Sequence, residues 1–171
     1  MILVRHAESE WNHDFSRTRI DPGIPDPPLT AAGRRQAQRL AAELAAAGVV
    51  RLIASPYRRT LETASIVGQA LHLTIAIEPL VRERCVYACD LGTPPGELAK
   101  LWPALDFAAL EEQWWGEPEE SEASIRHRAA TFRAQSAHLT DRASVAVITH
   151  WGFIRAITGA EVANAACVRV S

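Results

Sequence analysis

Two short apolar runs, each ending in a histidine, constrain the fold of this chain more than any other feature. Residues 1–4 lead into Arg5 and His6, and residues 144–149 lead into His150. A short apolar run without polar alternation is typical of a strand buried on both faces in a parallel sheet. Open α/β sheets bind ligands at the carboxyl ends of their strands, so both histidines face one crevice if these strands are neighbours. Taken singly, each histidine is equally well explained as a hydrogen-bonded residue at a strand end.

Length and composition predict a single globular domain over residues 1–171. The chain is 48% hydrophobic and 22% charged, as soluble proteins are. No apolar run approaches the roughly 18 residues of a membrane helix. Arg5 interrupts the first run too early for a signal peptide, so we expect a cytoplasmic protein without a membrane partner. The net charge of -2 argues against a general nucleic-acid surface. The protein is expected to be a monomer or a homodimer.

The cysteines indicate neither a disulfide framework nor a metal centre. There are three of them, Cys85, Cys89 and Cys167, and an odd number sets no paired framework. Cys85 and Cys89 are close enough in sequence to share a metal ion, but no second ligand pair follows at zinc-finger spacing. Reduced thiols are the simpler interpretation in a cytoplasmic protein. We therefore predict no metal and no other cofactor.

The rest of the chain alternates predicted strands and helices. Strands are expected at 1–4, 49–54, 73–77, 144–149 and 165–170, and helices at 30–48, 55–72, 96–102, 107–114, 123–139 and 153–159. This order indicates βαβ units, hence an α/β fold: a three-layer αβα sandwich with a mostly parallel central sheet and helices on both faces. Residues 13–28 are rich in proline and predict a long loop. Its Arg17 and Arg19 either reach a substrate or remain solvated.

Several side chains gather where the predicted strands end. They are Arg5, His6, Arg58, Arg59, Glu83 and His150. A guanidinium group can bind two oxygens of a phosphoryl group at once, through two parallel hydrogen bonds. A helix starting at Ser55 and Pro56 would add backbone N–H donors. These features predict a phosphate ester as substrate. The sequence contains no P-loop, dinucleotide fingerprint, cysteine-phosphatase loop or metalloprotease motif, which leaves histidine as the nucleophile among the strand-end groups.

Four motifs occur in a fixed order along nearly the whole chain. They are Arg5-His6-Ala7-Glu8-Ser9-x-x-Asn12, Pro28-Leu29-Thr30-x-x-Gly33-x-x-Gln36-Ala37, Ser55-Pro56-x-x-Arg59-x-x-x-Thr63-Ala64 and Thr149-His150-x-Gly152-x-x-Arg155. Together they resemble the signature of the histidine phosphatase superfamily, the phosphoglycerate-mutase-like proteins. The resemblance implies the phosphoglycerate-mutase-like fold and a place in the small phosphatase branch.

The resemblance also implies catalytic roles. His6 would be the nucleophile that forms a phosphohistidine, and Glu83 would protonate the leaving group and then activate water. The phosphoryl oxygens would be bound by Arg5, Asn12, Arg59 and His150. The catalytic set is then His6, Glu83 and His150. Three other carboxylates are also expected near the site and could replace Glu83, namely Glu8, Glu78 and Asp90. The alternative role for Glu83 itself is a surface salt bridge.

Two positions depart from the family pattern. Ala7 replaces a glycine, which is tolerated if its φ is negative. Trp151 replaces another glycine and either roofs the pocket or turns into the core. We expect a substrate pocket formed by Ser9, Trp11, Arg17 and Trp151.

Three functions are compatible with these residues. The first is a phosphatase that hydrolyses a small phosphate monoester, which the short chain favours because the family's mutases are longer. The second is a phosphoglycerate-mutase-type phosphoryl transfer, an isomerase. The third is a non-catalytic module that binds a phosphorylated ligand. In each case the expected partner is a small phosphorylated molecule.

Overall fold

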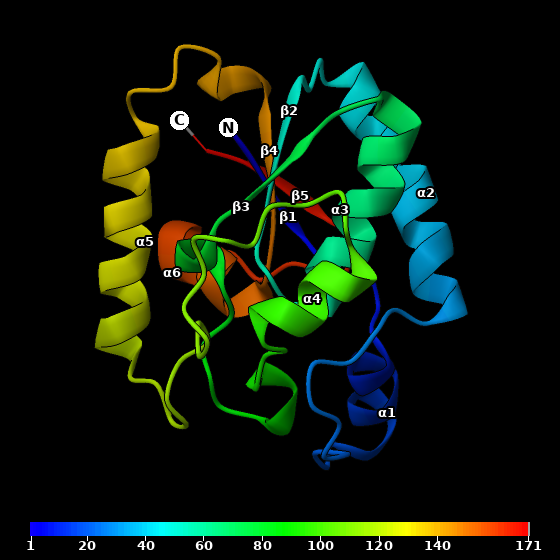
Figure 1. Ribbon diagram of the computed structural model, residues 1–171, viewed down its shortest axis with the longest axis vertical. Helices are drawn as coiled ribbons and strands as arrows, with labels where there is room; N and C mark the ends of the chain where they lie inside the picture. Colours follow the sequence, from blue (N-terminus) through cyan, green and yellow to red (C-terminus); the bar gives the residue numbers. More distant parts are fainter. Residues whose placement is uncertain (171) are drawn as a thin grey trace.

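The computed structural model describes residues 1–170 and contains a five-stranded sheet flanked by helices (Figure 1). The strands are β1 (Ile2–Arg5), β2 (Arg51–Ala54), β3 (Ile75–Ile77), β4 (Val145–Thr149) and β5 (Cys167–Arg169). The helices are α1 (Glu10–Thr18), α2 (Ala31–Ala46), α3 (Arg58–Leu71), α4 (Pro95–Leu101), α5 (Glu122–Ser136) and α6 (Trp151–Thr158). Within this part of the chain, no helix has the length and hydrophobicity that crossing a membrane requires.

The strand order places the two histidine-bearing strands side by side. The order is β3-β2-β4-β1-β5, and all neighbours are parallel except β5, which runs antiparallel to β1. Arg5 at the end of β1 lies opposite Thr149 at the end of β4. His6 and His150, which follow these residues, therefore leave the sheet at the same edge.

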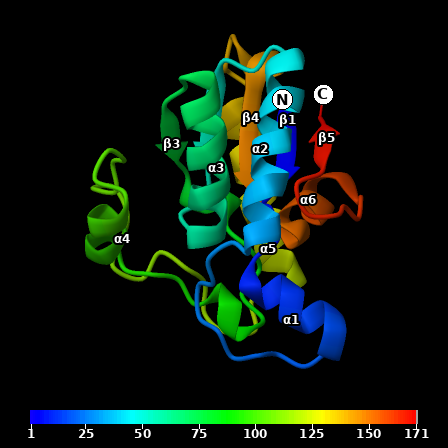
Figure 2. The ribbon, with the colours of Figure 1, turned by 90° about the vertical axis from the view of Figure 1, so that its right-hand side faces the viewer.

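Alternate residues of each central strand are buried on opposite faces of the sheet. Ile2 and Val4 pack in the core that contains residues of α2 and α3. Leu3 packs in the core that contains residues of α5 and α6. Figures 1 and 2 show these helix pairs on either side of the sheet, with α1 beyond the carboxyl end of β1. The predicted αβα sandwich with a mostly parallel sheet is confirmed.

The prediction of a loop over residues 13–28 is wrong in its first part, because α1 extends through Thr18. Ser9 caps this helix: its side chain accepts from the Asn12 backbone N–H, while the Asn12 side chain accepts from the Ser9 N–H. Such a reciprocal capping box stabilises a helix start. The rings of Trp11 and Phe15 stack one turn apart, with centroids separated by 4.4 Å. Only the residues after Thr18 form the expected loop.

The predicted start of the second helix at Ser55 and Pro56 is also wrong. Helix α3 begins at Arg58 with Tyr57 as its N-cap. The Ser55 hydroxyl lies 2.9 Å from Nε2 of His150, so it is not available as a cap. The first helical N–H, that of Arg58, donates to the buried Asp26 carboxylate at 2.8 Å. This amide is therefore not free for a substrate anion.

Residues 107–114 form turns, so the helix predicted there is absent. The segment is held by its side chains instead. Phe107 and Trp114 are both buried, and the Trp114 indole N–H donates to the Thr93 carbonyl at 2.9 Å. The Trp114 ring also packs against Tyr57 with centroids 4.6 Å apart. Tertiary packing of large rings here replaces regular backbone hydrogen bonding.

Candidate active site

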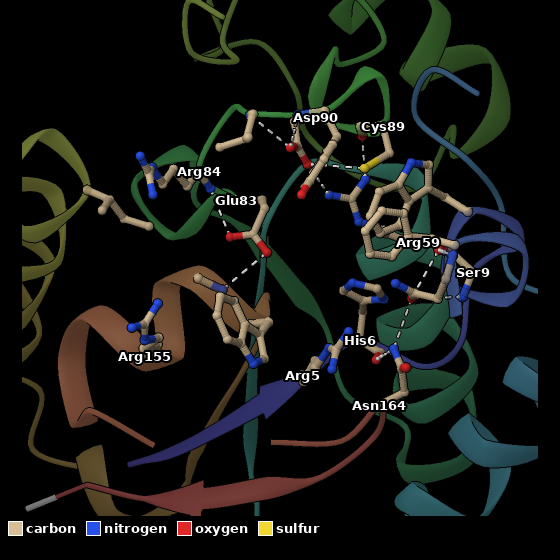
Figure 3. Close-up of a pocket in the computed structure, with 18 of the residues that line it drawn as sticks. Arg5, His6, Ser9, Arg59, Glu83, Arg84, Cys89, Asp90, Arg155 and Asn164 are labelled. Carbon is tan, nitrogen blue, oxygen red and sulfur yellow. Dashed lines mark hydrogen bonds and ion pairs between the residues drawn. The ribbon is translucent and has the colours of Figure 1, made fainter. Parts of the chain in front are cut away.

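A cavity of about 920 Å³ opens where β1 ends (Figure 3). Arg5 and His6 lie at its base, and its walls come from α1, the N-terminus of α3, the segment 83–90, the first turns of α5, α6 and Asn164. Segments that are far apart in the sequence thus meet at the edge of the sheet where the two histidine-bearing strands end. The sequence predicted a crevice at this edge.

The His6 imidazole is buried and held in one protonation form. Its Nδ1 lies 2.7 Å from the Ala7 carbonyl oxygen. Because a carbonyl oxygen only accepts, Nδ1 carries the proton and Nε2 keeps a free electron pair. Burial, followed by the positive charges of Arg59 and Arg5, lowers the pKa of His6 well below its ordinary value. The ring is therefore a neutral potential nucleophile at neutral pH.

Two guanidinium groups, the buried Arg59 and the partly buried Arg5, flank His6 and are fixed by backbone carbonyls. Arg5 Nη1 donates to the Val162 oxygen at 2.8 Å. Arg59 Nη1 donates to the Cys89 oxygen at 2.7 Å, and its Nη2 pairs with an oxygen of Asp90 at 3.1 Å. Their remaining N–H groups supply positive charge and donors where an anion would approach His6.

His150 lies behind His6 and does not line the cavity. It is fully buried, and the two rings meet edge to face with centroids 5.2 Å apart. Burial, followed by the charge of Arg59, lowers the pKa of His150 well below its ordinary value. Its Nδ1 is buried without a hydrogen-bond partner among the described residues.

Glu83 points toward the space around His6 (Figure 3). Its Oε1 accepts from the Arg84 N–H at 2.8 Å and its Oε2 from the Gly152 N–H at 3.2 Å. Burial, followed by the negative charge of Asp90, raises the pKa of Glu83 to about 7. A carboxyl group with such a pKa both gives and accepts protons near neutral pH.

The other nearby carboxylates are placed differently. Glu8 and Glu78 do not line the cavity: Glu8 accepts from the Thr30 hydroxyl at 2.6 Å, and Glu78 caps a short turn through Leu80 N–H at 2.9 Å. Asp90 does line the cavity, but as the partner of Arg59.

The two asparagines of the cavity form a linked pair. The Asn12 side-chain oxygen accepts from the Ser9 N–H, the Ser9 hydroxyl and Asn164 Nδ2, the last at 3.0 Å. The Asn12 amide NH₂ is then the group left to donate toward an anion. Asn164 also donates to the His6 carbonyl at 3.1 Å. Sequence reasoning missed Asn164, because it lies in a loop without any motif.

Three of the four expected pocket residues line the cavity. These are Ser9, Trp11 and Trp151. The guanidinium carbon of Arg155 lies over the Trp151 ring, 5.2 Å from the ring centroid. Arg17 is not among the lining residues; its helix instead presents Phe15 and Ser16, and the C-cap residue Arg19 also lines the cavity. The Tyr87 ring packs against the rings of Trp11 and Phe15, with centroids 5.1 and 5.4 Å apart, so one wall of the cavity is aromatic.

The backbone accommodates the alanine that replaces the first motif's glycine. Ala7 is fully buried, is not among the residues of positive φ, and donates its N–H to the Thr63 hydroxyl at 3.1 Å. No left-handed backbone is required at this position.

The cysteines are free thiols, and residues 1–170 contain no group of three or more His, Cys, Asp or Glu side chains arranged to hold a metal ion. Cys85 and Cys89 are buried and Cys167 is exposed. Burial raises the pKa of Cys85 to about 11 and that of Cys89 still higher. These thiols stay protonated at neutral pH, which makes them poor nucleophiles.

Comparison with known proteins identifies the family. The model of the histidine phosphatase superfamily (branch 1) matches residues 1–164. The chain belongs to the histidine phosphatase superfamily. The family expected from the four sequence motifs is therefore confirmed.

Among its relatives, this histidine phosphatase superfamily member is 32% identical over 168 residues to phosphoserine phosphatase 1 of Hydrogenobacter thermophilus, covering 92% of this chain and 73% of that protein. It is 43% identical over 83 residues to the probable phosphoglycerate mutase GpmB of Proteus mirabilis, covering 48% of this chain and 37% of the mutase. The GpmB relative from Yersinia enterocolitica is 39% identical over 114 residues, covering 67% and 46%. The chain spans less than half the length of these two relatives.

Solved structures show the same fold. A mycobacterial glucosyl-3-phosphoglycerate phosphatase in complex with VO₃ superimposes with a TM-score of 0.68 at 19% identity, covering 98% of this chain and 88% of that chain. The protein TTHB049 from Thermus thermophilus gives a TM-score of 0.60 at 26% identity, covering 97% and 89%.

Proposed function

We propose that this protein is a phosphatase that hydrolyses a small phosphate monoester through a phosphohistidine on His6. The observation that carries the proposal is the neutral His6 ring, whose Nδ1 is tied to a carbonyl while its Nε2 is free beside two fixed guanidiniums. A carboxyl group with a pKa of about 7, Glu83, shares the same cavity. A nucleophile, anion-binding groups and a proton donor are the components of phosphoryl transfer.

The proposed reaction has two steps. In the first, Nε2 of His6 attacks phosphorus, the bond to the ester oxygen breaks, and Glu83 gives its proton to the departing alcohol. In the second, the Glu83 carboxylate takes a proton from water, the water oxygen attacks phosphorus, and the nitrogen–phosphorus bond breaks. Arg5, Arg59 and the Asn12 amide bind the phosphoryl oxygens as their charge grows. His150 packs behind His6 and supports the ring's orientation.

The cavity is larger than a phosphoryl group alone would fill, so the proposed substrate also has a sizeable alcohol part. The cavity of about 920 Å³ is near the upper end of ordinary small-molecule sites. Its lining includes the aromatic wall of Trp11, Phe15 and Tyr87, together with Trp151 and Arg155. The relation to a phosphoserine phosphatase supports a metabolite-sized ester.

A parallel assay of two activities tests the proposal. Phosphate release is measured on a panel of phosphorylated metabolites and an aryl phosphate, and interconversion of phosphoglycerates is measured beside it. Net phosphate release is expected. Interconversion without net phosphate release would establish the mutase alternative. The similarity to the probable phosphoglycerate mutases GpmB supports that alternative. Binding without turnover would establish the non-catalytic module.

The pH dependence of kcat/KM is expected to reflect His6 and Glu83. The lowered pKa of His6 keeps the nucleophile neutral down to a pH well below 6.5. Glu83 must be protonated to act as an acid, and its pKa is raised to about 7, so activity falls as the pH rises through about 7. Initial rates on an alkyl phosphate, whose alcohol leaves only with a proton, check this between pH 5 and 9; they should fall about tenfold per unit on the basic side. Glu83→Gln should remove this basic limb, whereas a limb due to the substrate would persist in the variant.

Replacing Gly152 by alanine is expected to impair the position of Glu83. A β-carbon at residue 152 would overlap with Oε1 of Glu83. Gly152 lies in α6 and has no positive φ, so the expected effect comes from this overlap and not from backbone strain. We expect kcat/KM to fall roughly 10- to 100-fold, as displacement of a catalytic group by about 1 Å does. Gly96→Ala is the matched control, because a β-carbon on Gly96 of α4 meets nothing within 4 Å. Wild-type kinetics in Gly152→Ala would contradict the assigned position of Glu83.

A further inference from the structure

Asp90 is a buried carboxylate inside the cavity that the reaction described above does not use. It is 2% exposed and comes from a short turn after Glu83. One oxygen pairs with Arg59 Nη2 at 3.1 Å, and the other accepts from the N–H groups of Val86 and Tyr87, each at 3.0 Å. A carboxylate beside an anion-binding site repels the substrate, so its presence there needs a reason.

The first effect of Asp90 is on the orientation of Arg59. The two terminal nitrogens of this guanidinium are held by adjacent residues, Nη1 by the Cys89 carbonyl and Nη2 by Asp90. The Tyr57 ring covers its face, with the guanidinium carbon 4.3 Å from the ring centroid. A guanidinium held on two nitrogens and one face has lost its rotamer freedom before a substrate arrives. Preorganised charge of this kind is what stabilises a phosphoryl transition state.

The second effect of Asp90 is on the proton of Glu83. The charged side chains that act on the Glu83 carboxyl are Arg5 from β1, Arg59 from α3 and Asp90 from its own segment. From α5, Arg128 Nη2 reaches the Glu83 carbonyl at 3.3 Å, and α6 contributes the Gly152 N–H. Asp90 and Glu83 line the same cavity (Figure 3), so the Asp90 charge favours the protonated form of Glu83. After burial, this charge is the largest cause of the raised pKa of Glu83.

Asp90 is not itself placed as the proton donor. Each of its polar contacts is a donor: the Arg59 guanidinium, two backbone N–H groups and the Cys89 thiol, whose sulfur lies 3.5 Å from Oδ1. Both carboxyl oxygens act as acceptors in these contacts, so none of the contacts uses a proton carried by Asp90.

We propose that Asp90 is a positioning residue that fixes the Arg59 guanidinium for the phosphoryl group and holds the proton on Glu83 until the ester bond breaks. The proposal rests on the phosphatase function proposed above. It links two groups that meet the substrate at different atoms, so the loss of Asp90 should affect binding of the phosphoryl group and protonation of the alcohol together.

The test compares Asp90→Asn with wild-type protein on an alkyl phosphate, whose alcohol leaves only with a proton, across pH. The asparagine oxygen can still accept from Val86 and Tyr87, so the turn is kept, while its NH₂ faces Arg59 without attraction. We expect kcat/KM to fall roughly 10- to 100-fold. The basic limb of the profile should also move to lower pH by about 0.5 unit or more, because the charge that holds the proton is gone.

Two further variants separate this role from a general loss of structure. Asp141→Asn breaks the ion pair with Arg51 (2.8 Å), which lies outside the cavity, and should leave both the rate and the pH limb unchanged. Asp90→Glu keeps the charge, so its limb should stay at the wild-type pH even if its rate falls. This variant decides the question if Asp90→Asn does not fold, because a limb shifted despite the retained charge would overturn the proposal.

The outcomes distinguish this proposal from the underlying function. An Asp90→Asn profile that keeps the wild-type limb overturns the positioning role, whatever its rate. A loss confined to esters with poor leaving groups would identify Asp90 as the proton donor and also overturns it. If the wild-type protein releases no phosphate from any ester, the phosphatase function fails first; Asp90→Asn would then be compared for affinity to inorganic phosphate, and unchanged affinity would overturn the orientation of Arg59 by Asp90.

Discussion

Replacing His6 by alanine is expected to lower phosphate release from an aryl phosphate by about 10⁴-fold or more, as loss of a nucleophile does. Without the imidazole no nitrogen–phosphorus bond forms, and the protonated thiols of Cys85 and Cys89 offer no substitute. The fold should persist, because the His6 backbone N–H still donates to the Thr149 carbonyl at 2.9 Å. Initial rates together with thermal unfolding of both proteins check the two halves of this prediction.

A covalent label gives the same prediction a second readout. Wild-type protein quenched during turnover of a phosphorus-labelled ester should retain a phosphoryl group that is stable to alkali and lost in acid. His6→Ala should retain none, whereas His138→Ala, which changes an exposed histidine outside the cavity, should retain as much as wild type. Turnover or labelling that survives in His6→Ala would exclude the nucleophilic role.

The central sheet could be predicted because its physical signal is local. An unbroken apolar run such as residues 145–148 can only be buried on both faces, and the βαβ order then fixes parallel neighbours. The polar residues at the end of each run, Arg5 and His6 among them, must leave the core at one edge. The sequence predicted that the two histidines meet if their strands are neighbours, and the strand order fulfils that condition.

The errors lie where tertiary packing decides the local backbone. Helix α1 was missed because the proline-rich residues after it dominate the pattern, while its capping pair, Ser9 and Asn12, lies within a motif attributed to ligand binding. The start of α3 was misplaced because Ser55 hydrogen-bonds to His150, a residue 95 positions away. No rule based on neighbouring residues detects that contact.

The same limit applies to the candidate site. Arg5, His6, Arg59 and Glu83 line the cavity as expected, but His150 lies behind it and Arg17 outside its lining. Asn164 was missed because only folding brings its loop to His6. The close approach of Gly152 to Glu83 explains why a glycine follows Trp151, yet this contact joins two segments that are far apart in the sequence.

Replacing Glu83 by glutamine is expected to slow esters of poorly leaving alcohols far more than esters of nitrophenol. An alkoxide leaves only with a proton, whereas nitrophenolate leaves without one, so kcat/KM should fall about 10²- to 10⁴-fold for alkyl phosphates and less than about tenfold for the nitrophenyl ester. Glutamine still accepts from the Arg84 N–H through its side-chain oxygen, which limits structural change. A series of esters of graded alcohol acidity measures the difference as a slope.

The second step should reveal the same group acting as a base. When water is no longer activated, the phosphohistidine accumulates, and Glu83→Gln should release a burst of nitrophenol followed by a slow steady state. Glu78→Gln is the matched control, because Glu78 lies outside the cavity lining and its bond to the Leu80 N–H survives in glutamine. Equal losses on good and poor leaving groups would show that another carboxyl supplies the proton. Among the three alternatives Glu8, Glu78 and Asp90, only Asp90 lines the cavity, so it would be the residue to test next.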